Sequence, residues 1–383
     1  MDFNLHFTDP DQGAVSSGGL GRSCRDKLKT EAARAISIIR NWPGYAATPL
    51  CSLPGLAQKT GVGRIEIKDE SGRFGLGSFK ALGGAYAISR LLEGHSSDST
   101  LTVCCATDGN HGRSVAWGAQ MFGCNCVVFI HKAVSDERKQ SIEHYGARVV
   151  RTAGNYDDSV REAQETAERE GWTVVSDTSY EGYRDIPMDV MAGYSIMTTE
   201  AIEQWGGSAP QTHVFLQTGV GSMAASVVVQ LQQAYGEDCP KIVLVDPVKA
   251  ACWYDSLKAG APQVVSGDLD TIMAGLSCGE VSHLAWELLQ HDVAGVMTID
   301  DSVAEQAMRV LAQGNDQDRP LVAGESGVGG LAGFIAVAHD EAARAKLGID
   351  GDSRLMFFST EGATDRDVYQ KIVGKTPEQV TSA

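Results

Sequence analysis

Residues 102–112, with the sequence TVCCATDGNHG, join a buried-strand pattern to a polar turn and the start of a helix. The first half is a short apolar run, which is typical of a strand inside a parallel sheet. Two glycines follow within the turn, and apolar residues then recur at helical spacing. In an open parallel sheet, such a turn lies at the carboxyl end of a strand, where ligands bind. We therefore expect Asp108, Asn110 and His111 to face a cleft; helix capping by Asp or Asn is the simpler alternative.

The same alternation of strand and helix continues on both sides of this unit. The predicted strands are 64–69, 102–107, 126–130, 147–151, 172–176, 214–218, 242–245 and 355–358. This order predicts an α/β fold with mainly parallel sheets. The length of 383 residues suggests two domains or two lobes. We expect each lobe to have three α/β/α layers, with a ligand between the lobes. We assign residues 1–78 and 206–383 to a large ligand-binding domain, and residues 79–205 to a small domain.

The composition excludes several classes of protein. Hydrophobic residues make up 43% and charged residues 21% of the chain, which excludes a disordered protein. The formal net charge is −17, so nucleic acid is not an expected partner, because phosphate binding depends on clustered Lys and Arg. The sequence has neither a run of 18 apolar residues nor a secretory signal, so we expect no membrane span and a cytoplasmic location.

The histidines and cysteines give little sign of a metal site. The nine His show no paired ligand spacing, so no bound metal is expected. The nine Cys are scattered, and most are expected to be small core residues in a reducing compartment. Cys252 and Cys278 lie beside aromatic or glycine-rich segments, and a redox pair between them is left open.

Lys80 stands at the expected start of a helix, directly after a loop that contains Gly72, Gly75 and Gly77. Most lysines are solvated surface charges, and this is the alternative for Lys80. Partial burial and the positive end of the helix would both disfavour the ammonium form. A neutral amine is what imine chemistry requires. We therefore expect Lys80 to be an uncharged nucleophile in the cleft.

A third glycine-rich turn, TGVGSMA at 218–224, lies between another predicted strand and helix. Successive amides at a helix N-terminus bind phosphate. The turn also fits the dinucleotide pattern GxGxxA, with Asp246 as the ribose-binding acid, so an NAD-dependent oxidoreductase is an alternative on this segment alone. One phosphate site, one amine and one polar loop together favour a compact phosphorylated aldehyde, namely pyridoxal phosphate.

These segments resemble the fold-type II pyridoxal phosphate enzymes, the tryptophan synthase β-subunit superfamily. Within it, longer segments resemble the diaminopropionate ammonia-lyase family. These segments are KDESGRFGLGSFKALGGAYA at 68–87, ATDGNHGRSVAW at 106–117, DTSYEGY at 177–183, AGESGVGG at 323–330 and STEGATD at 359–365. The resemblance covers residues 65–365, which is most of the chain.

The resemblance implies how the cofactor would be held. Lys80 would form the imine with the aldehyde, Asn110 would hydrogen-bond the 3′-oxygen, and Thr360 would face the pyridine nitrogen. The phosphate would be bound by the backbone amides of the glycine turn and one hydroxyl, from Gly219, Val220, Gly221, Ser222 and Met223.

The resemblance also implies the reaction, which is β-elimination of 2,3-diaminopropionate to pyruvate and two molecules of ammonia through an aminoacrylate. Asp108 departs from the wider superfamily, where Ser or Thr commonly stands, and a carboxylate there suits a substrate with an extra ammonium. Lys80 could serve one face of the substrate and Asp108 the other, so that both D and L isomers react. Asp177 would be the second acid.

The nearest alternative is a dehydratase acting on serine, threonine or a 3-hydroxy amino acid with the same cofactor. An NAD-dependent oxidoreductase and a non-catalytic cofactor-binding module are more distant alternatives. The segment 324–333 predicts a loop and a tight helix start, with a cofactor or substrate-closing role as the alternative. The resemblance implies a homodimer.

Overall fold

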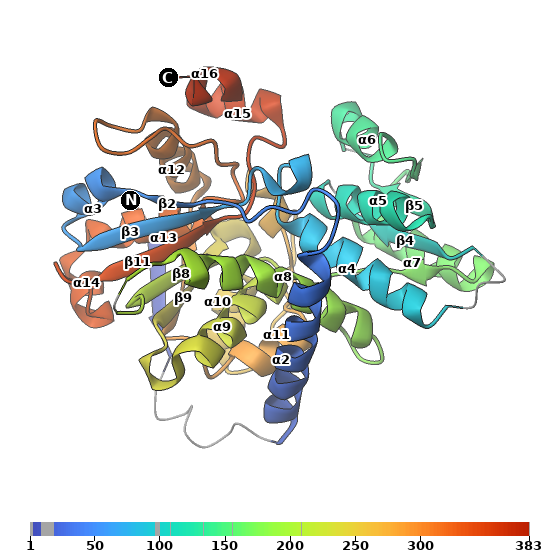
Figure 1. The fold of residues 1–383 in the computed structure, drawn as a ribbon, viewed down its shortest axis with the longest axis horizontal. Coiled ribbons are helices and arrows are strands. Elements are labelled where there is room, and N and C mark those ends of the chain that lie inside the picture. The colour runs from blue at the N-terminus through green and yellow to red at the C-terminus, as the bar shows by residue number, and fades with distance from the viewer. Residues whose placement is uncertain are drawn as a thin grey trace.

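A computed structural model describes residues 3–8, 19–95, 100–107, 109–132, 134–154, 156–207 and 209–382. The chain folds around two separate β-sheets (Figure 1), as the strand–helix alternation predicts. One sheet has seven strands and is drawn from both ends of the chain, and the other has four strands from its middle. This separation is consistent with the two domains expected from the sequence, whose boundaries at 78/79 and 205/206 stay a prediction.

The seven-stranded sheet has the order β1-β10-β9-β8-β11-β3-β2. Its five inner strands run parallel, and the two edge strands pair antiparallel with their neighbours. The strands are β1 (Phe3–Phe7), β2 (Leu50–Ser52), β3 (Arg64–Asp69), β8 (His213–Gln217), β9 (Lys241–Pro247), β10 (Gly295–Ile299) and β11 (Arg354–Ser359). The sequence prediction missed both edge strands and β10.

The four-stranded sheet has the order β6-β5-β4-β7, and all its strands run parallel. The strands are β4 (Thr102–Ala106), β5 (Asn125–Ile130), β6 (Arg148–Arg151) and β7 (Thr173–Val174). Parallel strands need crossover connections, and helices supply them here. Figure 1 shows this sheet with α5, α6 and α7 on the right of the molecule.

Helices cover both faces of each sheet, because successive strand residues point to opposite sides. In the large sheet, Val214 and Leu216 belong to the core cluster that contains α9, whereas Phe215 belongs to the cluster that contains α13. In the small sheet, Cys105 packs on the α5 side and Cys104 on the α7 side. Both lobes therefore have the expected three layers.

The helices, in chain order, are α2 (Gly19–Ile39), α3 (Pro54–Thr60), α4 (Lys80–Glu93), α5 (Asn110–Phe122), α6 (Asp136–Glu143), α7 (Tyr156–Glu170), α8 (Asp185–Gln204), α9 (Ser222–Tyr235), α10 (Cys252–Ala259), α11 (His283–Leu289), α12 (Asp301–Gln313), α13 (Gly329–Ala338), α14 (Glu341–Leu347), α15 (Arg366–Val373) and α16 (Pro377–Thr381). Single turns of 3₁₀-helix are η1 (Arg73–Gly75), η2 (Gly236–Asp238), η3 (Val248–Ala250) and η4 (Ala274–Leu276). None of the helices in the described residues is long and apolar enough to cross a membrane.

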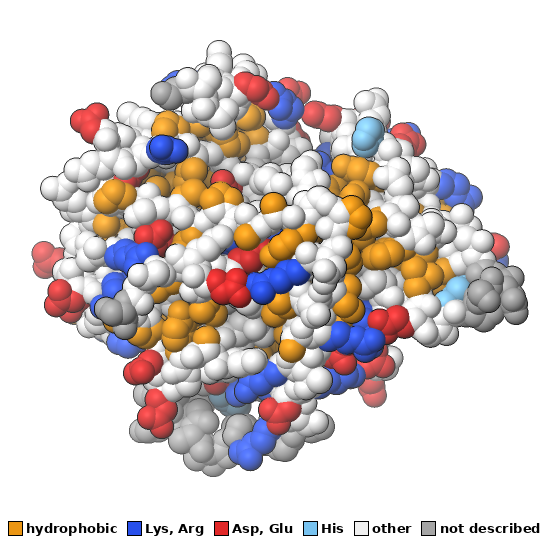
Figure 2. All heavy atoms as spheres, viewed as in Figure 1, with side chains coloured by type: hydrophobic (Ala, Val, Ile, Leu, Met, Phe, Trp, Pro, Cys, Tyr) orange, Lys and Arg blue, Asp and Glu red, His pale blue; other side chains and the backbone are white. Residues whose placement is uncertain are grey.

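The surface carries charges of both signs. Figure 2 shows Asp and Glu side chains scattered over one face and mixed with Lys and Arg. On that face, the acidic side chains are therefore not gathered over one element.

Candidate active site

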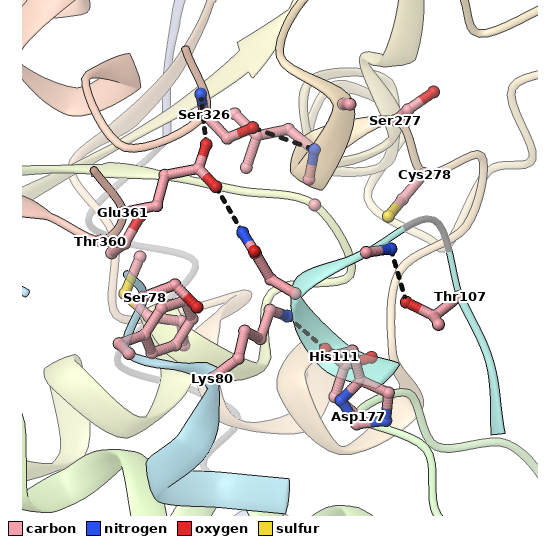
Figure 3. A pocket seen from close by; sticks show the side chains of 18 of the residues that line it. Ser78, Lys80, Thr107, His111, Asp177, Ser277, Cys278, Ser326, Thr360 and Glu361 are labelled. Carbon is pink, nitrogen blue, oxygen red and sulfur yellow. Dashed lines mark hydrogen bonds and ion pairs between the residues drawn. The ribbon is translucent and has the colours of Figure 1, made fainter. Parts of the chain in front are cut away.

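The glycine-rich turns recognised in the sequence line one cavity. Its walls come from the start of α4, the turn between β4 and α5, the turn between β8 and α9, and the segment after β11 (Figure 3). Each of these segments follows the carboxyl end of a parallel strand, so strand direction alone brings residues from both sheets together. Asp108 lies outside the described residues.

Lys80 is the first residue of α4 and points into the cavity beside Asp177 (Figure 3). The preceding loop turns tightly, with positive φ of 71° at Gly75 and 74° at Gly77. The amide of Phe79 donates a 3.0 Å hydrogen bond to the carbonyl of Thr360, which fixes the end of this loop to the segment after β11. The position of Lys80 is therefore set by backbone contacts on both sides.

Lys80 Nζ donates a hydrogen bond to Asp177 Oδ2 in a partly buried ion pair. Burial opposes a charge at this position, but the adjacent carboxylate prevails and raises the pKa of Lys80 above its ordinary value. The expectation of an uncharged amine is therefore wrong for this arrangement. The reason is the ion pair with Asp177, which lies 97 residues away in the sequence. Burial and the helix end, from which the expectation was drawn, do not reveal this partner.

Asp177 follows β7 and lies close to His111 as well as to Lys80. Burial alone would raise the pKa of Asp177, but Lys80 and His111 prevail and lower it. His111 is buried, and its Nε2 lies 2.8 Å from the carbonyl oxygen of Val175. This contact joins α5 to the strand end that carries Asp177. Burial also lowers the pKa of His111, which favours the neutral ring.

Asn110 begins α5, and both ends of its side-chain amide are engaged. The Nδ2 group donates to Glu361 Oε2, and Oδ1 accepts a 2.8 Å hydrogen bond from Arg113. Glu361 also accepts a 3.0 Å bond from the amide of Ser326. These contacts join the small-sheet turn to two segments of the large lobe.

Thr360 lies in the cavity wall with its hydroxyl oriented by Gln217. Gln217 Nε2 donates to Thr360 Oγ1 at 3.0 Å, so the hydroxyl oxygen is used as an acceptor. Its proton remains available to donate. The sequence had placed Thr360 in the site but gave no sign of Gln217, which is a buried strand residue.

The turn at 219–223 combines close packing with helix-end amides. Gly221 has φ of 95°, and a Cβ there would lie 2.3 Å from the ring of Trp253. Helix α9 begins at Ser222, so the first amides of the helix have no intrahelical acceptor. The hydroxyl of Ser222 donates to the backbone carbonyl of Asp177, which holds the turn against the Lys80 ion pair. A small anion fits this turn, because the amides are unpaired within the helix and side chains are excluded.

Asp246 is fully buried, and its carboxylate accepts hydrogen bonds from backbone amides. It accepts 2.9 Å hydrogen bonds from the amides of Trp253 and Tyr254, and another bond from the hydroxyl of Thr218. Asp246 is therefore not accessible to a ribose. The NAD-binding alternative thus loses the acidic residue that would have bound the ribose hydroxyl.

Comparison with known proteins gives the same cofactor class as the cavity. The model for the family described as "Pyridoxal-phosphate dependent enzyme" matches residues 42–360. The diaminopropionate ammonia-lyase of Escherichia coli K12 is 43% identical over 351 residues, which is 86% of this chain and 88% of that protein. The chain belongs to the diaminopropionate ammonia-lyase family of pyridoxal-phosphate dependent enzymes. The Salmonella typhimurium LT2 enzyme of the same name is 39% identical over 88% of this chain and 90% of its own length.

Solved structures support the membership in this family. The crystal structure of the E. coli diaminopropionate ammonia-lyase with an aminoacrylate–PLP azomethine intermediate superposes with a TM-score of 0.88, at 38% identity and 97% coverage of both chains. A Solanum lycopersicum threonine deaminase shares the fold, with a TM-score of 0.76 at 19% identity and coverage of 97% and 96%. The chain is thus a fold-type II, pyridoxal phosphate-dependent lyase, and the predictions of fold and cofactor are confirmed.

Several residues of this ammonia-lyase family site were not found by sequence reasoning. They line the cavity or orient a residue that does: Arg113, Arg138, Gln217, Glu325, Ser326 and Glu361. The family-like segments at 323–330 and 359–365 were the available signal for three of them, but those segments did not show which side chains face inward.

Cys252 and Cys278 lie on two sides of Gly219. Cys252 Sγ lies 3.5 Å from the Gly219 carbonyl oxygen, and Cys278 Sγ would lie 3.1 Å from a Cβ at Gly219. No disulfide joins the two residues. Burial raises the pKa of the Cys252 thiol, which disfavours a reactive thiolate.

Proposed function

We propose that this lyase eliminates ammonia from 2,3-diaminopropionate and yields pyruvate and two molecules of ammonia. The proposal is supported by one observation above the others. The Lys80–Asp177 pair and the anion-binding turn line the same cavity, in a chain 43% identical to a diaminopropionate ammonia-lyase.

Lys80 is proposed as the residue that bonds the cofactor and moves a proton at the substrate Cα. Bound pyridoxal phosphate supplies an electron sink for the Cα–H bond that breaks. Lys80 must give up one proton before it can act as a nucleophile or base. Asp177 Oδ2 accepts the hydrogen bond from its ammonium and so orients the amine in the cavity. Asp177 is the proposed second acid, which holds or moves the proton of the β-ammonium that leaves.

The other proposed roles follow the positions of the side chains. The helix-end amides of Gly219 to Met223 hold the phosphate, together with the Ser222 hydroxyl once it turns from the carbonyl of Asp177. Asn110 binds the 3′-oxygen once its amide turns from Glu361. Thr360 donates its hydroxyl proton to the ring nitrogen. A hydroxyl cannot stabilise a lasting positive charge there, and this favours prompt loss of a β-substituent.

Asp108 remains the proposed base for the second isomer. A base on each face of the substrate would allow both D and L isomers to react, with Lys80 on one side and Asp108 on the other. The homodimer and the cytoplasmic location stay predictions.

The test is pyruvate formation by holoenzyme from 2,3-diaminopropionate, serine and threonine, each in D and L form. The proposal expects the largest kcat/KM with 2,3-diaminopropionate. The dehydratase alternative expects serine or threonine to be preferred. A relative has been crystallised with D-serine, so D-serine binding alone does not separate the two functions.

A further inference from the structure

Glu325 lies in the loop before α13 and lines the same cavity. It is only 2% exposed, yet its Oε2 atom has no hydrogen-bond partner. A buried carboxylate oxygen without a donor is costly, so its retention requires a reason. The mechanism above does not use Glu325.

The other carboxylates of the cavity wall within the described residues are already engaged. Asp177 is paired with Lys80. Glu361 accepts hydrogen bonds from Asn110, from the amide of Ser326 and, at 3.3 Å, from the hydroxyl of Thr364. Glu325 differs from these two carboxylates because one of its oxygens takes part in no hydrogen bond.

The charges around Glu325 compensate it incompletely. Its nearest cation is Arg138 of α6, with Nη2 4.0 Å from Oε1. Arg138 lies closer to a second carboxylate, Asp365, at 3.4 Å. Burial and the neighbouring Glu361 raise the pKa of Glu325 to about 8. A cation that entered the cavity beside Glu325 would reverse this effect and restore the carboxylate.

We propose that Glu325 binds the β-ammonium group of the substrate and so selects a diamino acid over a hydroxy amino acid. The inference rests on the proposed function and names the residue that confers its specificity. An ammonium supplies both the missing hydrogen-bond donor and the missing positive charge. A serine hydroxyl supplies a donor without the charge, and an anionic group is disfavoured beside Glu325 and Glu361.

The experiment compares Glu325→Gln with wild-type holoenzyme on 2,3-diaminopropionate and D-serine. Gln keeps the shape of the side chain and removes its charge. We expect KM for 2,3-diaminopropionate to rise about 10- to 100-fold, the usual range for a lost hydrogen bond to a charged group. The KM for D-serine, or its inhibition constant if it is not turned over, should stay within about twofold because a neutral donor gains little from the charge. The visible spectrum of the bound cofactor should not change.

Asp365→Asn is the matched control. It removes the other carboxylate beside Arg138, and Asp365 is not part of the cavity wall. We expect both kinetic constants to stay near wild type. Glu325→Ala should show the same selective loss as Glu325→Gln, and provides a second variant if the first does not fold.

An equal change for both ligands in Glu325→Gln would overturn the inference, since Glu325 would then act through Arg138 or the cofactor. A shifted cofactor spectrum, or an unchanged KM for 2,3-diaminopropionate, would overturn it as well. If wild-type enzyme makes no pyruvate from 2,3-diaminopropionate, the proposed function itself fails. If wild type does and the variant shows no selectivity, only the role of Glu325 fails.

Discussion

Two groups of charged side chains inside the molecule differ in how completely their charges are paired. The first, called here the paired cluster, consists of Lys68, Glu70, Arg73 and Glu200, each at most 1% exposed. The second, the cavity group, consists of Lys80, Asp177, Glu325 and Glu361 with Arg113 and Arg138. The cluster includes residues only a few positions before Lys80, yet none of its members lines the cavity.

The paired cluster balances two cations against two carboxylates. Glu200 accepts bonds from Arg73 and Lys68, both at 2.7 Å, and from the hydroxyl of Tyr45 at 2.9 Å. Glu70 accepts from Arg73 at 2.7 and 2.8 Å. In the cavity group, by contrast, Glu325 keeps an oxygen without a partner. The paired cluster therefore connects parts of the fold to one another, whereas the unpaired oxygen of Glu325 lies where a ligand can reach it.

The largest effect is expected for Lys80→Ala. Turnover should fall by about 10³-fold or more, because nucleophile and proton carrier are lost together. Stability should fall as well, because the partly buried carboxylate of Asp177 loses its partner. Pyruvate formation and thermal unfolding measure the two effects. Near-normal turnover would remove Lys80 from the mechanism.

Glu200→Gln tests the other side of the comparison. It leaves two buried cations short of a partner, so the free energy of unfolding should fall by about 3–5 kcal/mol. The control is Glu203→Gln on the same helix, whose ion pair with Arg40 is exposed and should contribute less than about 1 kcal/mol. Urea denaturation measures both variants. Equal losses would mean that burial of the cluster does not matter.

Asp177→Asn should lower kcat by about 10²-fold, within the range for loss of a general acid or base. It should also lower the pKa of Lys80, because the carboxylate that raises it is gone. The imine absorbance of added pyridoxal phosphate should therefore appear at lower pH than in wild type. An unchanged or higher pH midpoint would show that Asp177 does not control the amine.

A further effect is expected in the pH dependence of stability at Glu325. Its pKa is raised from 4.5 to about 8, so the folded protein holds a proton that the unfolded chain has lost between these values. The contribution of Glu325 to stability therefore falls as pH rises through this window. Gln does not titrate, so Tm of Glu325→Gln relative to wild type should increase from pH 5 to pH 8. A constant difference would show that the carboxyl group titrates normally.

Local pattern was enough to predict most strands and the turns that follow them. The runs at 102–107, 126–130 and 214–218 are apolar and end at glycine or polar residues, which fixes where the cavity lies in a parallel sheet. Strand β10 was missed although its sequence, GVMTI, is mostly apolar, because short apolar runs are ambiguous between strand and buried helix. The edge strands β1 and β2 have only five and three residues, and segments this short leave little pattern in the sequence.

Contacts between distant segments were beyond local pattern. Asn110 meets Glu361 across 251 residues, and Lys80 meets Asp177 across 97. The charge of Lys80 depends on its contact with Asp177. Helix position and burial alone therefore led to the wrong expectation of an uncharged amine. Glu325 carries no spacing signal, since its importance comes from an oxygen left without a donor.

The most direct measurement is borohydride reduction of the holoenzyme followed by peptide mapping with mass spectrometry. Reduction converts the imine into a stable bond between the cofactor and the lysine that carries it. The account predicts a single pyridoxyl-phosphate adduct on Lys80, and none in Lys80→Ala. An adduct on another lysine, or an undiminished adduct in the variant, would contradict it.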